Sequence, residues 1–416
     1  MTEVPAPTSI TSKVAVLASS QLIAGTGVAA GVSVGGLLAE DIAGTAAFSG
    51  LPQTGMVLGS ALAAVPLARL AGRAGRRRAL SLGYAIASIG AGLALASALT
   101  RSLPLLVVAS LVVGAGMAAG LQARFAATDG VPDARRGLVL SVVVWASSIG
   151  AILGPNLLEP GSRLGESLAG APLGGPWLFA IIALALATVV IAVGLRTPVP
   201  ATVPPKRKIR DTVRVVWANP AGRLSLVGMA SGHAVMVGVM VMTSVHLHGH
   251  GSSLTFVGIV ISAHVAGMYI LAPLFGWLSD RWGARAVVAL GVVGLVIACG
   301  FTASSGWVTR SGGSHHTAEM LATVGLVLLG LGWSAVTVAC ATMIAVVSHH
   351  ADAAPTDIQG VADLVMGLAG ATAGLLSGVV LANAGYVGLS LAGIVVLIPL
   401  IWVLVRYARE VATAAE

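Results

Sequence analysis

Long apolar runs separated by short polar turns constrain this chain more than any other feature. A helix needs about 20 apolar residues to cross the hydrocarbon core of a bilayer. Runs of that length occur at 14–38, 45–69, 79–99, 103–125, 137–158, 176–196, 221–247, 254–278, 286–304, 320–347, 359–383 and 386–406. Asp, Glu, Lys and Arg make up only 9% of the 416 residues, against about 25% in soluble proteins. The sequence therefore predicts an all-α membrane protein with twelve transmembrane helices, and it excludes disordered, collagen-like, disulfide-scaffold and nucleic-acid-binding classes.

The basic residues predict the orientation of these helices. Of the 23 Lys and Arg residues, only Arg101, Arg163 and Arg310 fall on the side opposite the other 20. Positive residues concentrate on the cytoplasmic side of membrane proteins. We therefore expect a multi-pass protein of the plasma (inner) membrane, surrounded by the lipid bilayer, with both termini cytoplasmic.

Two turns of the chain repeat at half its length. Aligning Gly72–Arg76 with Asp280–Ala284 gives an offset of 208 residues, half of 416. A proline-rich and then basic stretch lies between the two copies, as expected for an exposed connector. The sequence predicts two pseudo-symmetric six-helix bundles at 1–196 and 218–416, joined by a cytoplasmic linker at 197–217.

This organisation resembles the major facilitator superfamily of secondary transporters. The resemblance rests on the two six-helix halves, the connector, and a G-x-L-x-D-R-x-G-R-R-like turn after the second and eighth spans. The second-half turn, with Gly276, Asp280, Arg281, Gly283 and Arg285, matches best. The resemblance implies transport of a small solute by alternating access, in which the two bundles rock about a site near the bilayer midplane.

The resemblance also implies a set of residues that latch one conformation. Gly150-Ala-Ile-Leu-Gly154-Pro155 is similar to the G-x-x-x-G-P antiporter motif of the superfamily. In the first-half turn Gly72 stands where the family has an acid, and we hypothesise that Asp363 supplies the negative charge to Arg73 or Arg76. The expected latch residues are Arg73, Gly75, Arg76, Asp280, Arg281, Gly283, Arg285, Asp363, Gly150, Gly154 and Pro155.

Histidine and methionine gather in the seventh and eighth spans. On a helix, His233, Met236, Met240 and Thr243 share one face, and so do His264 and Met268. Met236 and His264 each lie about 11 residues, or roughly 16 Å, below the predicted outer surface. Thioether and imidazole form a soft, neutral ligand set that suits Cu(I). The expected substrate pathway comprises His233, Thr243, His246, His248, His250 and the mid-span Trp333.

The pattern M-x-x-x-M followed by H-x-x-x-M resembles the CcoA-like copper importers, a branch of the same superfamily. That resemblance implies copper uptake, with Met236, Met240, His264 and Met268 as the metal ligands. Two readings stay open. Either these residues carry Cu(I) as substrate, or the chain moves a small organic solute or drug, with His264 as a polar or proton-carrying group.

Enzyme and receptor functions are less compatible with the sequence. The chain contains neither H-E-x-x-H nor G-x-S-x-G, and none of Lys13, Lys206 and Lys208 follows a phosphate-binding glycine loop. Transport energy is therefore expected from an ion gradient, with protons as the coupling ion. We expect a transporter that needs no cofactor and works as a monomer.

Overall fold

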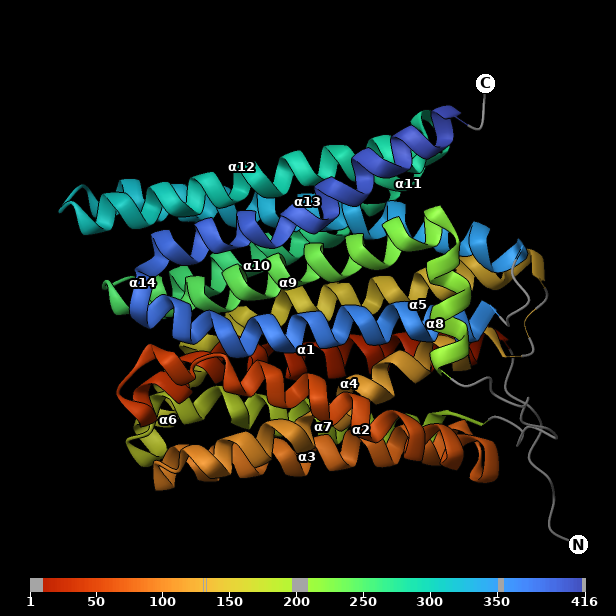
Figure 1. Ribbon diagram of the computed structural model, residues 1–416. Coiled ribbons are helices and arrows are strands. Elements are labelled where there is room, and N and C mark those ends of the chain that lie inside the picture. Colours follow the sequence, from red (N-terminus) through yellow and green to blue (C-terminus); the bar gives the residue numbers. More distant parts are fainter. Residues whose placement is uncertain (1–9, 130, 132, 197–208, 351–354, 414–416) are drawn as a thin grey trace, which may run out of the picture. The chain divides into compact units, whose positions relative to one another are not determined.

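A computed structural model of the 416-residue chain describes residues 10–129, 131, 133–196, 209–350 and 355–413. Every regular element within these ranges is a helix (Figure 1). The predicted all-α class is confirmed.

The chain divides into two compact units. The first unit comprises 1–44, 51–204 and 254–262, and the second comprises 45–50, 205–253 and 263–416. Helices of the first unit are α1 (Ile10–Ala43), α2 (Leu51–Ala74), α3 (Arg76–Thr100), α4 (Leu103–Thr128), α5 (Asp133–Leu153), α6 (Leu158–Ala169) and α7 (Gly175–Gly194). Helices of the second unit are α8 (Ile209–Ala218), α9 (Pro220–Gly249), α11 (Ala272–Trp282), α12 (Ala284–Arg310), α13 (His315–His350) and α14 (Pro355–Thr413), while α10 (Leu254–Tyr269) contributes to both units. Three short 3-10 helices, η1 (Ala46–Phe48), η2 (Gly154–Leu157) and η3 (Pro172–Gly174), complete the set.

The membrane-spanning helices agree with the predicted twelve once α14 is divided. Within the described residues, 11 helical stretches are long and apolar enough to cross a bilayer. The last, Asp357–Glu410, is 54 residues long, about twice the length that a span needs. Gly385 interrupts it with φ 67° and ψ −176°, a conformation open to glycine. The eleventh and twelfth predicted spans lie on either side of this residue.

Two spans are less regular than their apolar runs suggested. The fifth span was expected at 137–158, but α5 ends at Leu153, and η2 then leads into α6. The eighth span was expected to be continuous over 254–278, but it breaks between Tyr269 and Ala272. Proline explains both differences, because Pro155 and Pro273 stand at the first positions of the following helix, where a missing backbone N–H is tolerated.

The two repeated turns adopt the same backbone conformation. Gly75, before α3, has φ 87° and ψ 159°, and Gly283, before α12, has φ 83° and ψ 140°. These residues are 208 positions apart, the offset of the sequence repeat. A side chain would be strained at this positive φ, so each copy of the turn requires its glycine.

The predicted linker contains a helix. Residues 197–208 lie outside the described residues, and α8 occupies most of the remainder of 197–217. Its Thr212 and Val216 are buried, and α8 runs across the direction of α9 in Figure 1. Asn219 ends the connection by capping α9, because its side chain accepts hydrogen bonds from the backbone N–H groups of Ala221 (2.9 Å) and Gly222 (3.3 Å). The stretch expected to be an exposed connector, 197–211, lies mostly outside the described residues, and its described residues 209–211 are exposed.

Candidate functional site

Three aromatic side chains from three helices form a cluster in the second unit. The indole N–H of Trp333 on α13 donates a hydrogen bond of 3.1 Å to Nδ1 of His233 on α9. Tyr269, the last residue of α10, presents its ring edge-on to Trp333 with centroids 6.3 Å apart. The His233 and Trp333 centroids are 6.0 Å apart. We call His233, Tyr269 and Trp333 the aromatic cluster.

The structure of α14 accommodates this cluster. A Cβ atom on Gly370 would lie only 2.6 Å from the His233 ring, so glycine is needed at this position for the imidazole to fit. The Trp333 side chain is 8% exposed, and the other two residues are half-buried. A buried polar N–H with a fixed acceptor beside half-buried ring faces is typical of a site that orients a small molecule.

The four predicted metal ligands lie on two helices. Met236 and Met240 are on α9, and the first is buried while the second is half-buried. His264 and Met268 are on α10 and buried. His264 is held against α13, because its Nδ1 lies 2.7 Å from the carbonyl oxygen of Leu326. Its other ring nitrogen, Nε2, is buried and meets no hydrogen-bond partner among the described residues.

Metal-ligating histidines commonly donate one ring N–H to a carbonyl and present the other nitrogen to the metal. His264 fits that arrangement. The described residues contain no group of three or more His, Cys, Asp or Glu side chains that could hold a metal ion. A site here would therefore depend on the methionine thioethers. The assignment of the four ligands stays a prediction.

The C-terminal end of α9 is tied to α14 through Tyr386. The hydroxyls of Thr243 and Tyr386 lie 2.6 Å apart, and His246 stacks on the Tyr386 ring with centroids 4.2 Å apart. Nδ1 of His250 is 2.7 Å from the carbonyl oxygen of His246. Nδ1 of His248 is 3.4 Å from the carbonyl oxygen of Ser252. Thr243 and His246 are buried, so of these four predicted pathway residues only His248 and His250 are exposed.

The arginines of the first-half turn find an acid within their own unit. Nε of Arg76 lies 3.0 Å from the Asp129 carboxylate at the end of α4, and Lys13 on α1 donates to the Asp129 backbone carbonyl. Arg73 is exposed in the last turn of α2. Asp129 therefore supplies a negative charge that the first-half turn lacks at Gly72.

The second-half turn is more open. Asp280, Arg281 and Arg285 are exposed, and the guanidinium of Arg281 lies 5.3 Å from the centroid of the Trp277 ring. Asp363 on α14 accepts a hydrogen bond of 3.2 Å from Nε2 of Gln359. Its proposed pairing with Arg73 or Arg76 stays a prediction.

The antiporter-like motif is a helix-packing surface in the first unit. A Cβ atom on Gly150 would collide with the Leu22 carbonyl of α1 and lie 2.8 Å from the Thr26 nitrogen. Gly154 approaches α1 in the same way, one turn further on. Pro155 meets α10, where a Cβ atom on Gly258 would lie 2.5 Å from the Pro155 carbonyl oxygen. Small residues thus let three backbones come together.

Three residues of these clusters were absent from the predicted set. Tyr269 and Tyr386 are two of only four tyrosines, and both lie inside apolar runs, where a buried hydroxyl needs a partner. The rarity of tyrosine was the feature of the sequence that could have identified Tyr269 and Tyr386. Asp129 was harder to identify, because it lies in a turn, where a solvated carboxylate is common.

The helices, the repeated turns and the polar clusters within the spans define a multi-pass membrane transporter. Comparison with known proteins agrees. The model of the Major Facilitator Superfamily matches residues 17–251 and 224–416. The chain belongs to this superfamily.

Several relatives resemble the chain over most of its length. The uncharacterized MFS-type transporter YddS of Bacillus subtilis is 34% identical over 95% of this chain and 91% of its own. YdeG, another uncharacterized MFS-type transporter of that organism, is 35% identical over 91% and 87%. The riboflavin transporter RfnT of Brucella anthropi is 26% identical over 85% of each chain. Among solved structures, an inward-facing bacterial homologue of the human lysosomal transporter Spinster has a TM-score of 0.70 at 17% identity, covering 96% of this chain and 97% of its own.

Proposed function

We propose that this chain is a proton-coupled secondary transporter of a small organic solute with a planar ring system. The aromatic cluster is the observation that carries the proposal. Indole, phenol and imidazole rings offer faces and edges on which a planar ring can stack. Polar groups placed among such rings fix the orientation of a ligand.

The hydrogen bond between Trp333 and His233 supports this role physically. Because the indole N–H is already occupied, the Trp333 ring is held in one orientation and its apolar face can serve a substrate. A preorganised ring loses less rotational freedom on binding. The relative described as a riboflavin transporter is in keeping with a planar, polar heterocycle as substrate, at 26% identity.

The first test is uptake of radiolabelled riboflavin into proteoliposomes that contain the purified chain. We expect accumulation above that of protein-free liposomes, stimulated by an inward proton gradient and abolished by a protonophore. Other planar heterocycles are then added unlabelled as competitors. If neither riboflavin nor any planar heterocycle is taken up or competes, the proposal is wrong.

Cu(I) is the second candidate substrate, and His264 favours it. Its Nδ1 is engaged by the Leu326 carbonyl and its Nε2 is buried without a partner among the described residues. An imidazole with one free lone pair suits a soft metal, and the thioether of Met268 lies one helical turn further along α10. This candidate does not involve the aromatic cluster.

The copper test compares the wild-type chain with the double variant Met236→Ala/His264→Ala in a host that lacks its own copper importer. If copper is the substrate, we expect higher cellular copper by elemental analysis with the wild type, and the level of the empty host with the variant at equal membrane abundance. Equal copper contents in all three strains would exclude Cu(I) as the substrate. The two assays distinguish the candidate substrates. Riboflavin uptake should be unchanged in Met236→Ala/His264→Ala, and copper uptake should be unchanged when Trp333 is replaced.

A further inference from the structure

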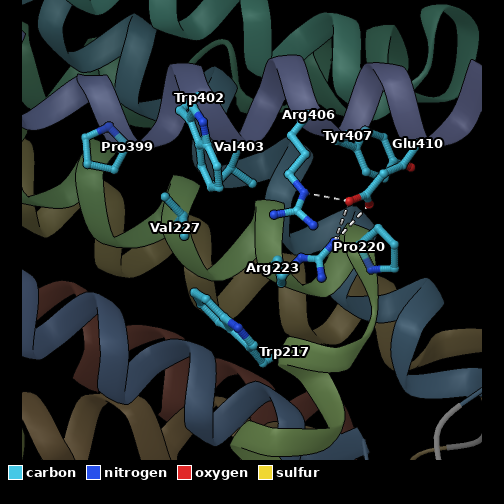
Figure 2. A pocket seen from close by; sticks show the side chains of 10 residues that line it. All are labelled: Trp217, Pro220, Arg223, Val227, Pro399, Trp402, Val403, Arg406, Tyr407 and Glu410. Carbon is cyan, nitrogen blue, oxygen red and sulfur yellow. Dashed lines mark hydrogen bonds and ion pairs between the residues drawn. The ribbon is translucent and has the colours of Figure 1, made fainter.

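A pocket of about 300 Å³ lies in the second unit, where α8, α9 and α14 meet (Figure 2). Its walls are mainly apolar and include Trp217, Val227, Pro399, Trp402 and Val403. Trp217 and Trp402 are 51% and 60% exposed, so the pocket opens on the outside of this unit. No part of the predicted substrate pathway contributes to it.

One end of the pocket carries an excess of positive charge. Glu410 on α14 accepts hydrogen bonds from Nη2 of Arg223, at 2.8 Å and 3.0 Å, and from Nε of Arg406, at 2.8 Å. Two guanidinium groups thus share one carboxylate. In Figure 2 one terminal amino group of Arg406 points away from Glu410 toward the side of the pocket where Val227 lies, and the guanidinium carbon is 5.6 Å from the centroid of the Trp402 ring. That amino group is suitably placed to donate to an anion.

The surroundings of the pocket resemble a membrane–water boundary. Pro220–Gly249 and Asp357–Glu410 are spanning stretches, whereas α8 is a separate ten-residue helix that precedes α9. Arg210 and Arg214 of α8 are exposed, while its Val216 is buried. A Cβ atom on Gly222 would collide with the Val216 carbonyl, so α8 is held close to the start of α9. Tryptophan beside arginine is typical of the headgroup level of a bilayer.

We propose that this pocket binds one anionic phospholipid. Its phosphate accepts hydrogen bonds from Arg406 and Arg223, and an acyl chain lies along the wall formed by Trp217 and Trp402. The apolar walls favour an amphiphile over a free inorganic anion, because a soluble anion would gain nothing from them. Arg223 and Arg406 together carry one more charge than Glu410 neutralises, and this net positive charge favours an anionic lipid over a zwitterionic one. The proposal is independent of the transported substrate.

Native mass spectrometry of the detergent-purified full chain tests this site. Phosphatidylglycerol and phosphatidylcholine with identical acyl chains are added at equal concentration. We expect phosphatidylglycerol adducts to predominate roughly fivefold, the effect of about one net arginine charge at a membrane surface. Arg406→Gln should reduce that preference to near one, because Arg223 remains neutralised by Glu410.

Matched variants separate headgroup recognition from general effects. Arg409→Gln removes an equal charge three residues away on an exposed position outside the pocket, and it should keep the preference. Trp402→Ala should weaken adducts of both lipids. Loss of the preference in Arg409→Gln, its retention in Arg406→Gln, or full displacement of phosphatidylglycerol by millimolar inorganic phosphate would each overturn the proposal. Equal elution of all variants as monodisperse protein confirms that they fold.

Discussion

Replacing Gly150 by alanine is expected to lower the equilibrium constant for folding roughly tenfold. The added Cβ atom would meet the Leu22 carbonyl oxygen and, at 2.8 Å, the Thr26 nitrogen, both in the backbone of α1. Backbone atoms cannot rotate away, so α1 and α5 must separate. Overpacking of this kind typically costs about 1–3 kcal/mol, and 1.4 kcal/mol corresponds to a factor of ten in a folding equilibrium. The measurement is the midpoint of thermal unfolding of the purified, solubilised protein, which should fall by several degrees.

The matched control for this substitution is Gly92→Ala on α3. Gly92 is also a helical glycine of the first unit, but a Cβ atom there has no neighbour within 4 Å among the described residues. Alanine should be neutral there or stabilise the helix by up to about 1 kcal/mol. If both variants were destabilised equally, the close contact between Gly150 and α1 would not be the reason that glycine is required there.

Trp333→Leu is expected to reduce uptake of the organic substrate more than tenfold while leaving the protein folded. Leucine keeps apolar volume in the site. It removes the ring face and the indole N–H that donates a hydrogen bond to His233. Stacking and the hydrogen bond together are worth about 2–3 kcal/mol, or a factor of about 30 to 150 in binding. Initial uptake rates in proteoliposomes at several substrate concentrations measure it.

Two further variants show whether the effect depends on the cluster. His233→Asn can still present an acceptor oxygen to the Trp333 N–H and should retain more uptake than His233→Leu. Trp307→Leu replaces a tryptophan of α12 that is 63% exposed, and it should transport like the wild type. Unchanged uptake by Trp333→Leu would remove the aromatic cluster from the binding site.

The sequence predicted the fold closely because its signals are local. The length of each apolar run shows directly whether it can cross a bilayer. Inside the bilayer a spanning segment must form all its backbone hydrogen bonds within itself, and this requirement selects helices. The repeated turns were visible for the same reason, since glycine at positions 75 and 283 is required by the backbone of the turn itself. The breaks at Pro155 and Pro273 were missed, because an apolar run alone does not show where a span is interrupted.

The clusters depend on contacts between distant segments, and these were predicted less well. His233 and Trp333 were both singled out, but 100 residues separate them, and nothing in the sequence indicated that one donates a hydrogen bond to the other. The pairing of Asp363 with Arg73 or Arg76 stays a prediction, and the ion pair between Arg76 and Asp129, 53 residues away, was not anticipated. Helical periodicity shows on which side of its own helix a residue lies, but it does not show which other helix packs against that side.

The sequence by itself determined that this chain is a twelve-helix membrane protein with an internal repeat. Hydrophobicity and glycine placement are properties of single segments, and they do not depend on how the segments meet. Only the tertiary structure decided that His233, Tyr269 and Trp333 form one cluster and that His264 is held by Leu326. It also decided that Arg223, Arg406 and Glu410 share one pocket. The physical reason is that side chains pair through the packing of helices far apart in the chain, and in an apolar environment each polar group stabilises only the arrangement that brings its partner within hydrogen-bond distance.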